Sequence, residues 1–455
     1  MKKGFLLLVL IIVAVVVGIQ WWVRTKGTTA VSETNQVQST GAGQPEIPLH
    51  EQLCSEGNQL LVEALSGRPD WSALFKEACD RYRRAVELMP DYYRAYFNWG
   101  ITLFSWARMA EPNMAGKLYL EASEKYYKVV QIDPNRHEAY NNWAAVLLGL
   151  AELGGPGAAE FGRQALDKYE KAAELQGDDP ETFANWGLAL IRYADLDEQQ
   201  AEASYRQAVE RFQTAIDLEP YNPKVYEGWG ASLYGLARRG GPDQEQYLRQ
   251  ACEMYQKATE QDPNMASALY NWAVALSAWG RLVGSAGGPL FEQACQRYAN
   301  ALQLQPDDPQ VLTGFIDALA DWICVEPNDP QARFTQATTL IDRLANMFPD
   351  QPAACNFLAR PLLRIARVAT DQAIRQEALD KAAQLCTRAE SIQTGSGAYH
   401  MASVAALRGD KAGCMQWLQK GQEHKTLPSG QQAISDGFLE SVQQEPWFQQ
   451  IQWGK

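Results

Sequence analysis

An asparagine stands immediately before a tryptophan at four places in the sequence, and this recurring pair is the clearest candidate for binding chemistry. The asparagines are Asn98, Asn142, Asn185 and Asn271. An asparagine side chain offers two donors and an acceptor, so it can hold the backbone amide of an extended peptide. On a helix, the residue before an inward-pointing tryptophan lies about 100° round the axis, toward the open face. The series therefore predicts a peptide-binding face, with simple solvation of the asparagines as the alternative.

Aromatic and basic side chains are expected to share this face. The predicted binding set adds Arg94, Phe97, Phe104, Arg192, Lys224, Tyr234 and Tyr270 to the four asparagines. In one repeat Gly228 replaces the asparagine. Aromatic anchors with local positive charge suit a peptide that carries apolar and acidic residues.

The residues that enzymes and metal sites require are scattered or missing. The histidines His50, His137, His400 and His424 have no metal-ligand spacing, and no GxSxG, HExxH, CxxC or GxxxxGK[ST] motif occurs. The eight cysteines are expected to be small buried packing residues, with their disulfide pairing left open. Loops such as Gly154-Gly155-Pro156 are expected to form turns. We therefore predict no enzyme, no catalytic, metal or cofactor-binding residue, and no small-molecule substrate.

The elements that position these residues follow from a fixed period. The tryptophans of the related segments, Trp99, Trp143, Trp186, Trp229 and Trp272, lie 44, 43, 43 and 43 residues apart. A period of this size is typical of a solenoid, in which each repeat buries its apolar face against its neighbours.

Each repeat is expected to contain two helices. In the first helix, Tyr96, Trp99 and Leu103 are spaced by three and four residues and share one face. The second helix carries an aromatic residue between two alanines, as in Ala208, Phe212 and Ala215, and ends before a proline. The period leaves two options open, longer helices or a longer loop between them.

This pattern resembles the tetratricopeptide repeat (TPR) over about residues 50 to 421. The resemblance implies an all-α, right-handed α-solenoid of about nine helix pairs, in which Gly100 faces Ala122 and Gly187 faces Ala208 across each pair. The asparagine series is similar to that of the repeat superhelix of O-linked N-acetylglucosamine transferase, which binds extended peptide backbones. The usual TPR period of 34 is shorter than the period here.

Residues 5–23 are apolar except for Gly18 and Gln20. Nineteen helical residues span roughly 28 Å, close to the thickness of a bilayer core. We therefore predict one transmembrane helix, with a cleaved signal peptide as the alternative. Two lysines before the segment match Arg24 and Lys26 after it, so the charge count does not orient the helix. The very short basic N-terminus slightly favours repeats on the extracytoplasmic side.

The rest of the chain divides by composition. Residues 24–47 are rich in Thr, Ser, Gln and Gly and predict a flexible linker, 48–421 form the solenoid, and 422–455 are expected to form an amphipathic capping helix. The formal net charge of −13 argues against nucleic acid as a partner. Two functions fit: a membrane-anchored scaffold or adaptor that binds a protein or peptide partner in its concave groove, or a structural component packed permanently in a membrane complex or against itself.

Overall fold

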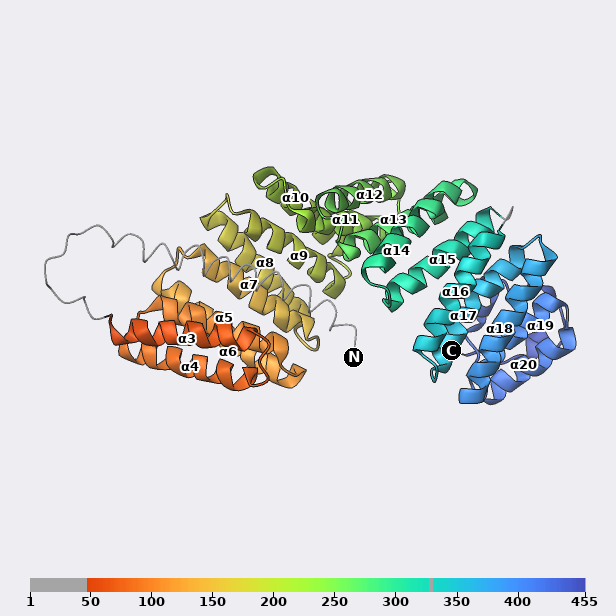
Figure 1. Cartoon of the computed structure of the whole chain (residues 1–455), viewed down its shortest axis with the longest axis horizontal. Helices are drawn as coiled ribbons and strands as arrows, with labels where there is room; N and C mark the ends of the chain where they lie inside the picture. Colours follow the sequence, from red (N-terminus) through yellow and green to blue (C-terminus); the bar gives the residue numbers. More distant parts are fainter. Residues whose placement is uncertain (1–46, 327–329, 455) are drawn as a thin grey trace. The chain divides into compact units, whose positions relative to one another are not determined.

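The computed structural model describes residues 47–326 and 330–454. Within these residues the regular structure is helical, and the one isolated β-bridge joins Ser429 to Gly454. The chain forms two compact bodies, an N-terminal body that ends at Leu196 and a C-terminal body that begins at Asp197 (Figure 1). The prediction of an all-α repeat fold is confirmed for the described residues.

The N-terminal body is a stack of helices that run back and forth in chain order (Figure 1). Its helices are α3 (Leu49–Leu65), α4 (Trp71–Leu88), α5 (Tyr93–Met109), α6 (Pro112–Ile132), α7 (His137–Glu152), α8 (Ala158–Leu175) and α9 (Pro180–Leu196). Each helix packs against the next, and the odd-numbered helices α3, α5, α7 and α9 also contact one another in sequence. These first helices of the repeats therefore form a continuous layer.

The C-terminal body continues the same alternation. Its helices are α10 (Ala201–Leu218), α11 (Pro223–Arg238), α12 (Gln244–Gln261), α13 (Ala266–Val283), α14 (Gly288–Leu304), α15 (Pro309–Val325), α16 (Gln331–Met347), α17 (Pro352–Val368), α18 (Gln372–Ile392), α19 (Ala398–Arg408) and α20 (Lys411–Glu423). The first helices α11, α13, α15, α17 and α19 contact one another in sequence. Within the two bodies, α3 to α8 make three helix pairs and α11 to α20 make five, while α9 ends the first body and α10 begins the second.

Glycines of the first helices allow the two helices of a repeat to approach closely. A Cβ atom built on Gly100 would lie 2.7 Å from the Tyr126 ring, and one on Gly230 would lie 2.8 Å from the Tyr255 ring. Both rings are fully buried. We expected Gly100 to face Ala122. Instead, its nearest neighbour is the tyrosine one helical turn further on, because the ring fills the space that the missing side chain leaves.

Most of the recurring tryptophans lie inside the stack, as predicted. Trp99, Trp186 and Trp272 are buried, whereas Trp143 and Trp229 are half-buried. Cations of the following second helix cover several of the rings. Lys125 Nζ lies 4.3 Å from the centroid of Trp99, and the Arg297 guanidinium lies 4.0 Å from that of Trp272. Cation–π attraction of this kind adds to the burial of the indole.

The long period arises mainly from long helices. Helices α11 and α12 have 16 and 18 residues, whereas α19 and α20, in the last repeat, have 11 and 13. The connection also differs, with five residues between α11 and α12 and two between α19 and α20. Both options left open by the sequence therefore contribute, and the helices contribute more.

The C-terminal cap differs from the single helix predicted over 422–455. Beyond α20 the chain forms the short helix α21 (Gly430–Ser435) and two 3-10 turns, η2 (Glu440–Val442) and η3 (Phe448–Gln450). Pro428, Pro446 and the left-handed Gly437, at φ 67°, prevent one continuous helix. The apolar residues expected to cap the stack still do so, because Leu439, Val442 and Phe448 join one buried cluster with residues of α19 and α20.

The predicted transmembrane helix, 5–23, and the predicted linker, apart from its last residue, lie outside the described residues. Within the described part of the chain, no helix combines the length and the apolar character that crossing a membrane would require.

Candidate functional site

All eleven residues of the predicted binding set lie on first helices, but they divide between the two bodies. The N-terminal body holds Arg94, Phe97, Asn98, Phe104, Asn142, Asn185 and Arg192, and the C-terminal body holds Lys224, Tyr234, Tyr270 and Asn271. The set therefore consists of two groups of residues, each on its own layer of first helices.

Asn98 has a partner within the protein. Its side chain is 9% exposed, and its Nδ2 donates to Asn58 Oδ1 over 2.9 Å. The same oxygen accepts from the Tyr82 hydroxyl over 2.8 Å. Asn58 lies on α3 and Asn98 on α5, so the amide pair joins two neighbouring first helices. This contact supplies a packing reason for an asparagine at this position that the repeat pattern alone does not reveal.

Two other asparagines of the series also contact their own chain. Asn271 Nδ2 donates to Glu227 Oε1 on α11 over 3.1 Å. Burial raises the pKa of Glu227, and hydrogen bonds from Ser267 and Asn271 oppose that shift. Burial raises the pKa of Tyr126, and a side-chain hydrogen bond with Asn142 opposes that shift. Asn142, Asn185 and Asn271 are all half-buried rather than fully exposed.

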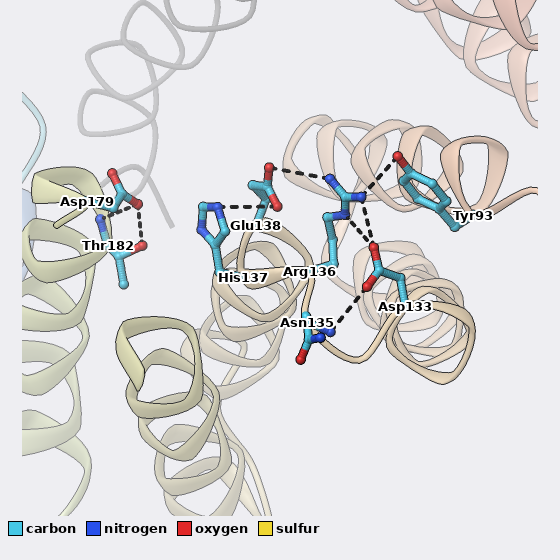
Figure 2. A network of polar contacts seen from close by, with 8 residues as sticks. All are labelled: Tyr93, Asp133, Asn135, Arg136, His137, Glu138, Asp179 and Thr182. Atoms are coloured by element: carbon cyan, nitrogen blue, oxygen red, sulfur yellow. Dashed lines mark hydrogen bonds and ion pairs between the residues drawn. The ribbon is translucent and has the colours of Figure 1, made fainter. Parts of the chain in front are cut away.

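The two basic residues of the set in the N-terminal body contact neighbours in their own chain. Arg94 Nε donates to the Tyr93 hydroxyl over 3.4 Å, and Arg136 Nη2 donates to the same oxygen over 3.1 Å. Figure 2 shows Arg136 between Tyr93 and Asp133, whose carboxylate lies 2.8 Å from Nη2. Arg192 Nε lies 3.4 Å from Glu152 Oε1. The contacts of Arg136 with Tyr93 and Asp133 connect the turn between α6 and α7 to the start of α5.

The aromatic members of the set serve partly as packing residues. Phe97 contacts Tyr126 edge to face, with ring centroids 5.9 Å apart, and Tyr270 contacts Tyr298 in the same way at 6.0 Å. Phe104, which we expected on the same face, lies 5.8 Å from the ring of Tyr119. Tyr234 is half-buried, and Lys224 is exposed.

A charged cluster in the C-terminal body was not predicted. At its centre is Asp321 of α15, which is 6% exposed. Its Oδ2 accepts from Arg281 Nε of α13 over 2.7 Å, and its Oδ1 accepts from Arg364 Nη2 of α17. Three successive first helices are thus joined by one carboxylate.

A cavity of about 320 Å³ opens beside this cluster. Its lining comes from α13, α15 and α17, and the lining residues are Arg281, Asp317, Asp321, Phe357, Arg360, Pro361 and Arg364. Burial raises the pKa of Asp317 and lowers the pKa of Arg364, whose side chains lie 3.6 Å apart. Phe357 is 45% exposed, so the cavity offers an apolar ring beside its guanidinium groups.

The segment after α21 reaches the same layer of helices. Asp436 Oδ1 accepts from Arg360 Nη2 over 3.2 Å, and Oδ2 accepts from the Tyr399 hydroxyl over 3.1 Å. The Asp436 carbonyl accepts from Arg367 Nη1 over 3.1 Å. Arg360 and Arg367 therefore bind a carboxylate residue that a non-helical segment presents.

One signal in the sequence could have found the cluster. Arg281 and Asp321 are 40 residues apart, and Asp321 and Arg364 are 43 apart, so opposite charges recur at nearly the repeat period. Asn58 and Asn98, which also pair, are 40 residues apart. Side chains one period apart on first helices lie opposite each other, and complementary types at that spacing predict a contact.

The cysteines behave as packing residues. All eight are free thiols, seven are buried, and Cys324 is half-buried. Burial raises the pKa of Cys79, Cys252 and Cys295 to about 12. Within the described chain, no group of three or more His, Cys, Asp or Glu side chains could hold a metal ion.

Paired helices, glycine–aromatic contacts and, in each body, a layer of first helices define an all-helical repeat protein whose helix pairs resemble those of TPR proteins. No protein-family model and no curated protein sequence matches this chain. The solved structures to which this chain is similar include TPR proteins.

Three of these structures illustrate the likeness. YrrB, described as a TPR protein with an unusual peptide-binding site, is 21% identical over 51% of this chain and 97% of its own, with a TM-score of 0.35. The C-terminal part of a TPR repeat-containing protein from Cytophaga hutchinsonii is 12% identical over 66% of this chain and 98% of its own, with a TM-score of 0.44. PilF of Pseudomonas aeruginosa is 17% identical over 58% and 94%, with a TM-score of 0.36.

Proposed function

We propose that the protein is a non-catalytic scaffold that binds a protein partner or an extended peptide segment on its layers of first helices. The observation that carries this proposal is the cavity formed jointly by α13, α15 and α17. Binding sites combine concave shape, exposed aromatic surface and a few placed polar groups, and this cavity has all three.

The first helices of the N-terminal body are a second part of the proposed surface. Asn142 and Asn185 are half-buried there, and Arg94 is exposed. Backbone amides of a peptide could add to the hydrogen bonds of these side chains. Asn98 has a structural role in this proposal, because its amide is buried and bonded to Asn58.

We further propose that residues 5–23 anchor the protein in a membrane by a single pass, with the repeats on the extracytoplasmic side. The support for the anchor is the length and apolar character of that sequence. Extraction of the full chain by alkaline carbonate, or a mature N-terminus beyond residue 26, would contradict the anchor. The side of the membrane on which the repeats lie can be tested with a cysteine engineered on their surface. An impermeant thiol reagent added to intact cells should label it if the repeats are extracytoplasmic.

Site-specific photocrosslinking tests the binding surface and requires no purified partner. Benzoylphenylalanine placed at Phe357 of α17 or Leu188 of α9 puts the probe on first helices, at sites that are 45% and 47% exposed. Matched controls of similar exposure on second helices are Leu304 of α14, at 38%, and Tyr127 of α6, at 49%. We expect a discrete protein adduct from the first-helix positions and none from the controls.

Other patterns of crosslinking would contradict the proposal. Adducts from the second-helix positions alone would place the partner on the opposite surface and favour the permanent structural component. Adducts of this chain with itself would favour self-association. A complete lack of adducts from the first-helix positions, in cells that express the protein natively, would reject the scaffold function.

A further inference from the structure

The donors of the cavity are held in place by a buried acid. Asp321 engages Nε of Arg281 and one terminal nitrogen of Arg364. A guanidinium carries five N–H donors, so each arginine retains donors beyond those contacts. The Arg281 side chain is also 52% exposed, which leaves it accessible to a ligand. The guanidinium groups are therefore oriented before any ligand arrives.

The charge balance of the cavity favours an anion. Four arginines, Arg281, Arg360, Arg364 and Arg367, and three acids, Asp317, Asp321 and Asp436, lie in or beside it, which leaves one positive charge in excess. Asp317 acts favourably on the charge of Arg364, whereas Arg281 and Arg367 act unfavourably on it. A carboxylate is the natural match, because it accepts paired hydrogen bonds from the planar fork of an arginine.

The chain itself shows how such an anion is bound. Asp436 approaches Arg360 and Tyr399 from a non-helical segment, and its own carbonyl accepts from Arg367. Its neighbour Gly437 permits this approach, because a Cβ atom there would lie 2.1 Å from Arg367 Nη1. Arginines of α17 thus bind the carboxylate and the backbone carbonyl of one residue in the turn after α21.

The cavity also offers an apolar contact and a limited volume. Phe357, Pro361 and Arg364 are spaced by four and three residues, so they share one face of α17. A volume of about 320 Å³ lies at the lower limit of the roughly 300–1,000 Å³ found for ligand sites. It suits one or two side chains of a peptide better than a cofactor.

We propose that this cavity binds an acidic peptide segment, with an Asp or Glu carboxylate on Arg281 and Arg364 and a neighbouring apolar residue on Phe357. The inference rests on the proposed function and adds the chemical class of the partner. Phosphorylated peptides are treated as an outcome of the test, since arginines also bind phosphate.

The test begins with an array of short fluorescein-labelled peptides that place Asp or Glu near Phe or Leu. Each acidic peptide has a counterpart with Asn or Gln and another with phosphoserine. Binding to the full chain is measured by fluorescence polarisation. We expect the best acidic peptides to bind at least about tenfold more tightly than their amide counterparts, as loss of a charged hydrogen bond predicts.

Variants of the protein then locate the site. Arg281→Gln should weaken binding of the acidic peptides about tenfold, because it removes donors while Asp321 keeps its pair with Arg364. Phe357→Ser should weaken binding several-fold, and only for peptides with the apolar residue. Arg249→Gln, which removes the same charge from an exposed position on the second helix α12, should leave the affinity unchanged. Circular dichroism of each variant confirms the fold.

Three results would overturn the inference. They are equal binding of acidic and amide peptides, an affinity that neither Arg281→Gln nor Phe357→Ser changes, and binding of phosphoserine peptides alone. If photocrosslinks from Leu188 and Phe357 persist in those cases, the scaffold function stands and only the acidic ligand is rejected. If the crosslinks are also missing, both proposals fail.

Discussion

Two joints between neighbouring first helices show how contacts about one repeat apart can serve different purposes. In the N-terminal body, Asn58 and Asn98 join α3 to α5 through a neutral hydrogen bond that is largely buried. In the C-terminal body, Asp321 joins α13 to α17 through arginines that remain partly exposed. Both joints connect residues 40 to 43 positions apart.

The two joints differ in the number of hydrogen-bond donors that they leave free for a ligand. Two amide side chains that hydrogen-bond to each other hold their helices together, but few of their donors and acceptors remain for a ligand. A buried acid with two arginines contributes cohesion as well, but each guanidinium has donors to spare. The side-chain types at each joint therefore determine how many donors remain for a partner.

The largest expected effect on stability comes from the charged joint, formed by Asp321 with Arg281 and Arg364. Asp321→Ala leaves Arg281 and Arg364 without their shared carboxylate, so the free energy of unfolding should fall by about 3–5 kcal/mol. Urea denaturation of the full chain measures the change. In contrast, Asp307→Ala breaks an exposed ion pair with Arg343 and should cost less than about 1 kcal/mol. Equal effects of the two variants would mean that Asp321 does not hold the joint.

The next effect concerns pH near the charged joint. Burial and the charge of Arg360 lower the pKa of His400 of α19 from 6.5 to about 4. The unfolded chain therefore takes up the proton first, and stability should fall as the pH falls from about 6.5 to about 4. His400→Gln should remove about 2–3 kcal/mol of this loss.

The measurement is the unfolding free energy of the wild-type chain and the His400→Gln variant at pH 7 and pH 4.5. His424→Gln changes an exposed histidine and serves as the control. Parallel pH profiles for the wild-type chain and His400→Gln would show that His400 does not stay neutral in the folded protein.

A smaller effect on stability is expected at the neutral joint, formed by Asn58 and Asn98. Asn98→Ala removes a buried hydrogen bond, so it should destabilise the chain by about 1–2 kcal/mol. Asn300→Ala, whose amide bonds the exposed Gln296 on the same helix, should cost less than about 0.5 kcal/mol. The two variants are compared by urea denaturation. If Asn98→Ala left stability unchanged but weakened peptide binding, the neutral joint would be a binding site after all.

The smallest effect on stability is expected for Arg281 of the charged joint, and it is compared with that of Arg364. Arg281→Gln should change the unfolding free energy by less than about 1 kcal/mol, because its side chain is half-exposed and Asp321 retains Arg364. Arg364→Gln should cost about 2 kcal/mol or more, since Arg364 is less exposed than Arg281 and pairs with both Asp317 and Asp321. Equilibrium unfolding in the absence of peptide measures both. A reversed order would make Arg281 the structural arginine.

Much of the fold could be predicted from the sequence because the repeat encodes it several times. The Trp99 and Gly100 positions recur at a fixed period, and helical spacing places them on one face. The cap could not be predicted in the same way. It occurs once, and Pro428 and Gly437 override the apolar pattern that suggested one continuous helix.

The candidate site was harder to predict, for a physical reason. The asparagines before the tryptophans lie on the first helices as predicted, but the repeat pattern does not reveal the partners of Asn98 and Asn271 on the neighbouring helices. Arg281, Asp321 and Arg364 belong to no recurring motif, and their opposite charges become informative only when they are compared one period apart. Predicting contacts between repeats therefore requires a comparison of residues one period apart.

The near-constant spacing of these joints has a consequence for how the gene can change. Because partners lie about one period apart, an in-frame duplication or loss of one 43-residue segment shifts every later first helix by one whole repeat. The joint of Asn58 and Asn98 would form again only if both moved together, because the positions equivalent to Asn58 in the next two repeats carry Ile101 and Ala145. Asp321 likewise would face an arginine only if Arg281 and Arg364 moved with it. The blocks from α3 to α5 and from α13 to α17 are therefore each inherited or lost as a whole.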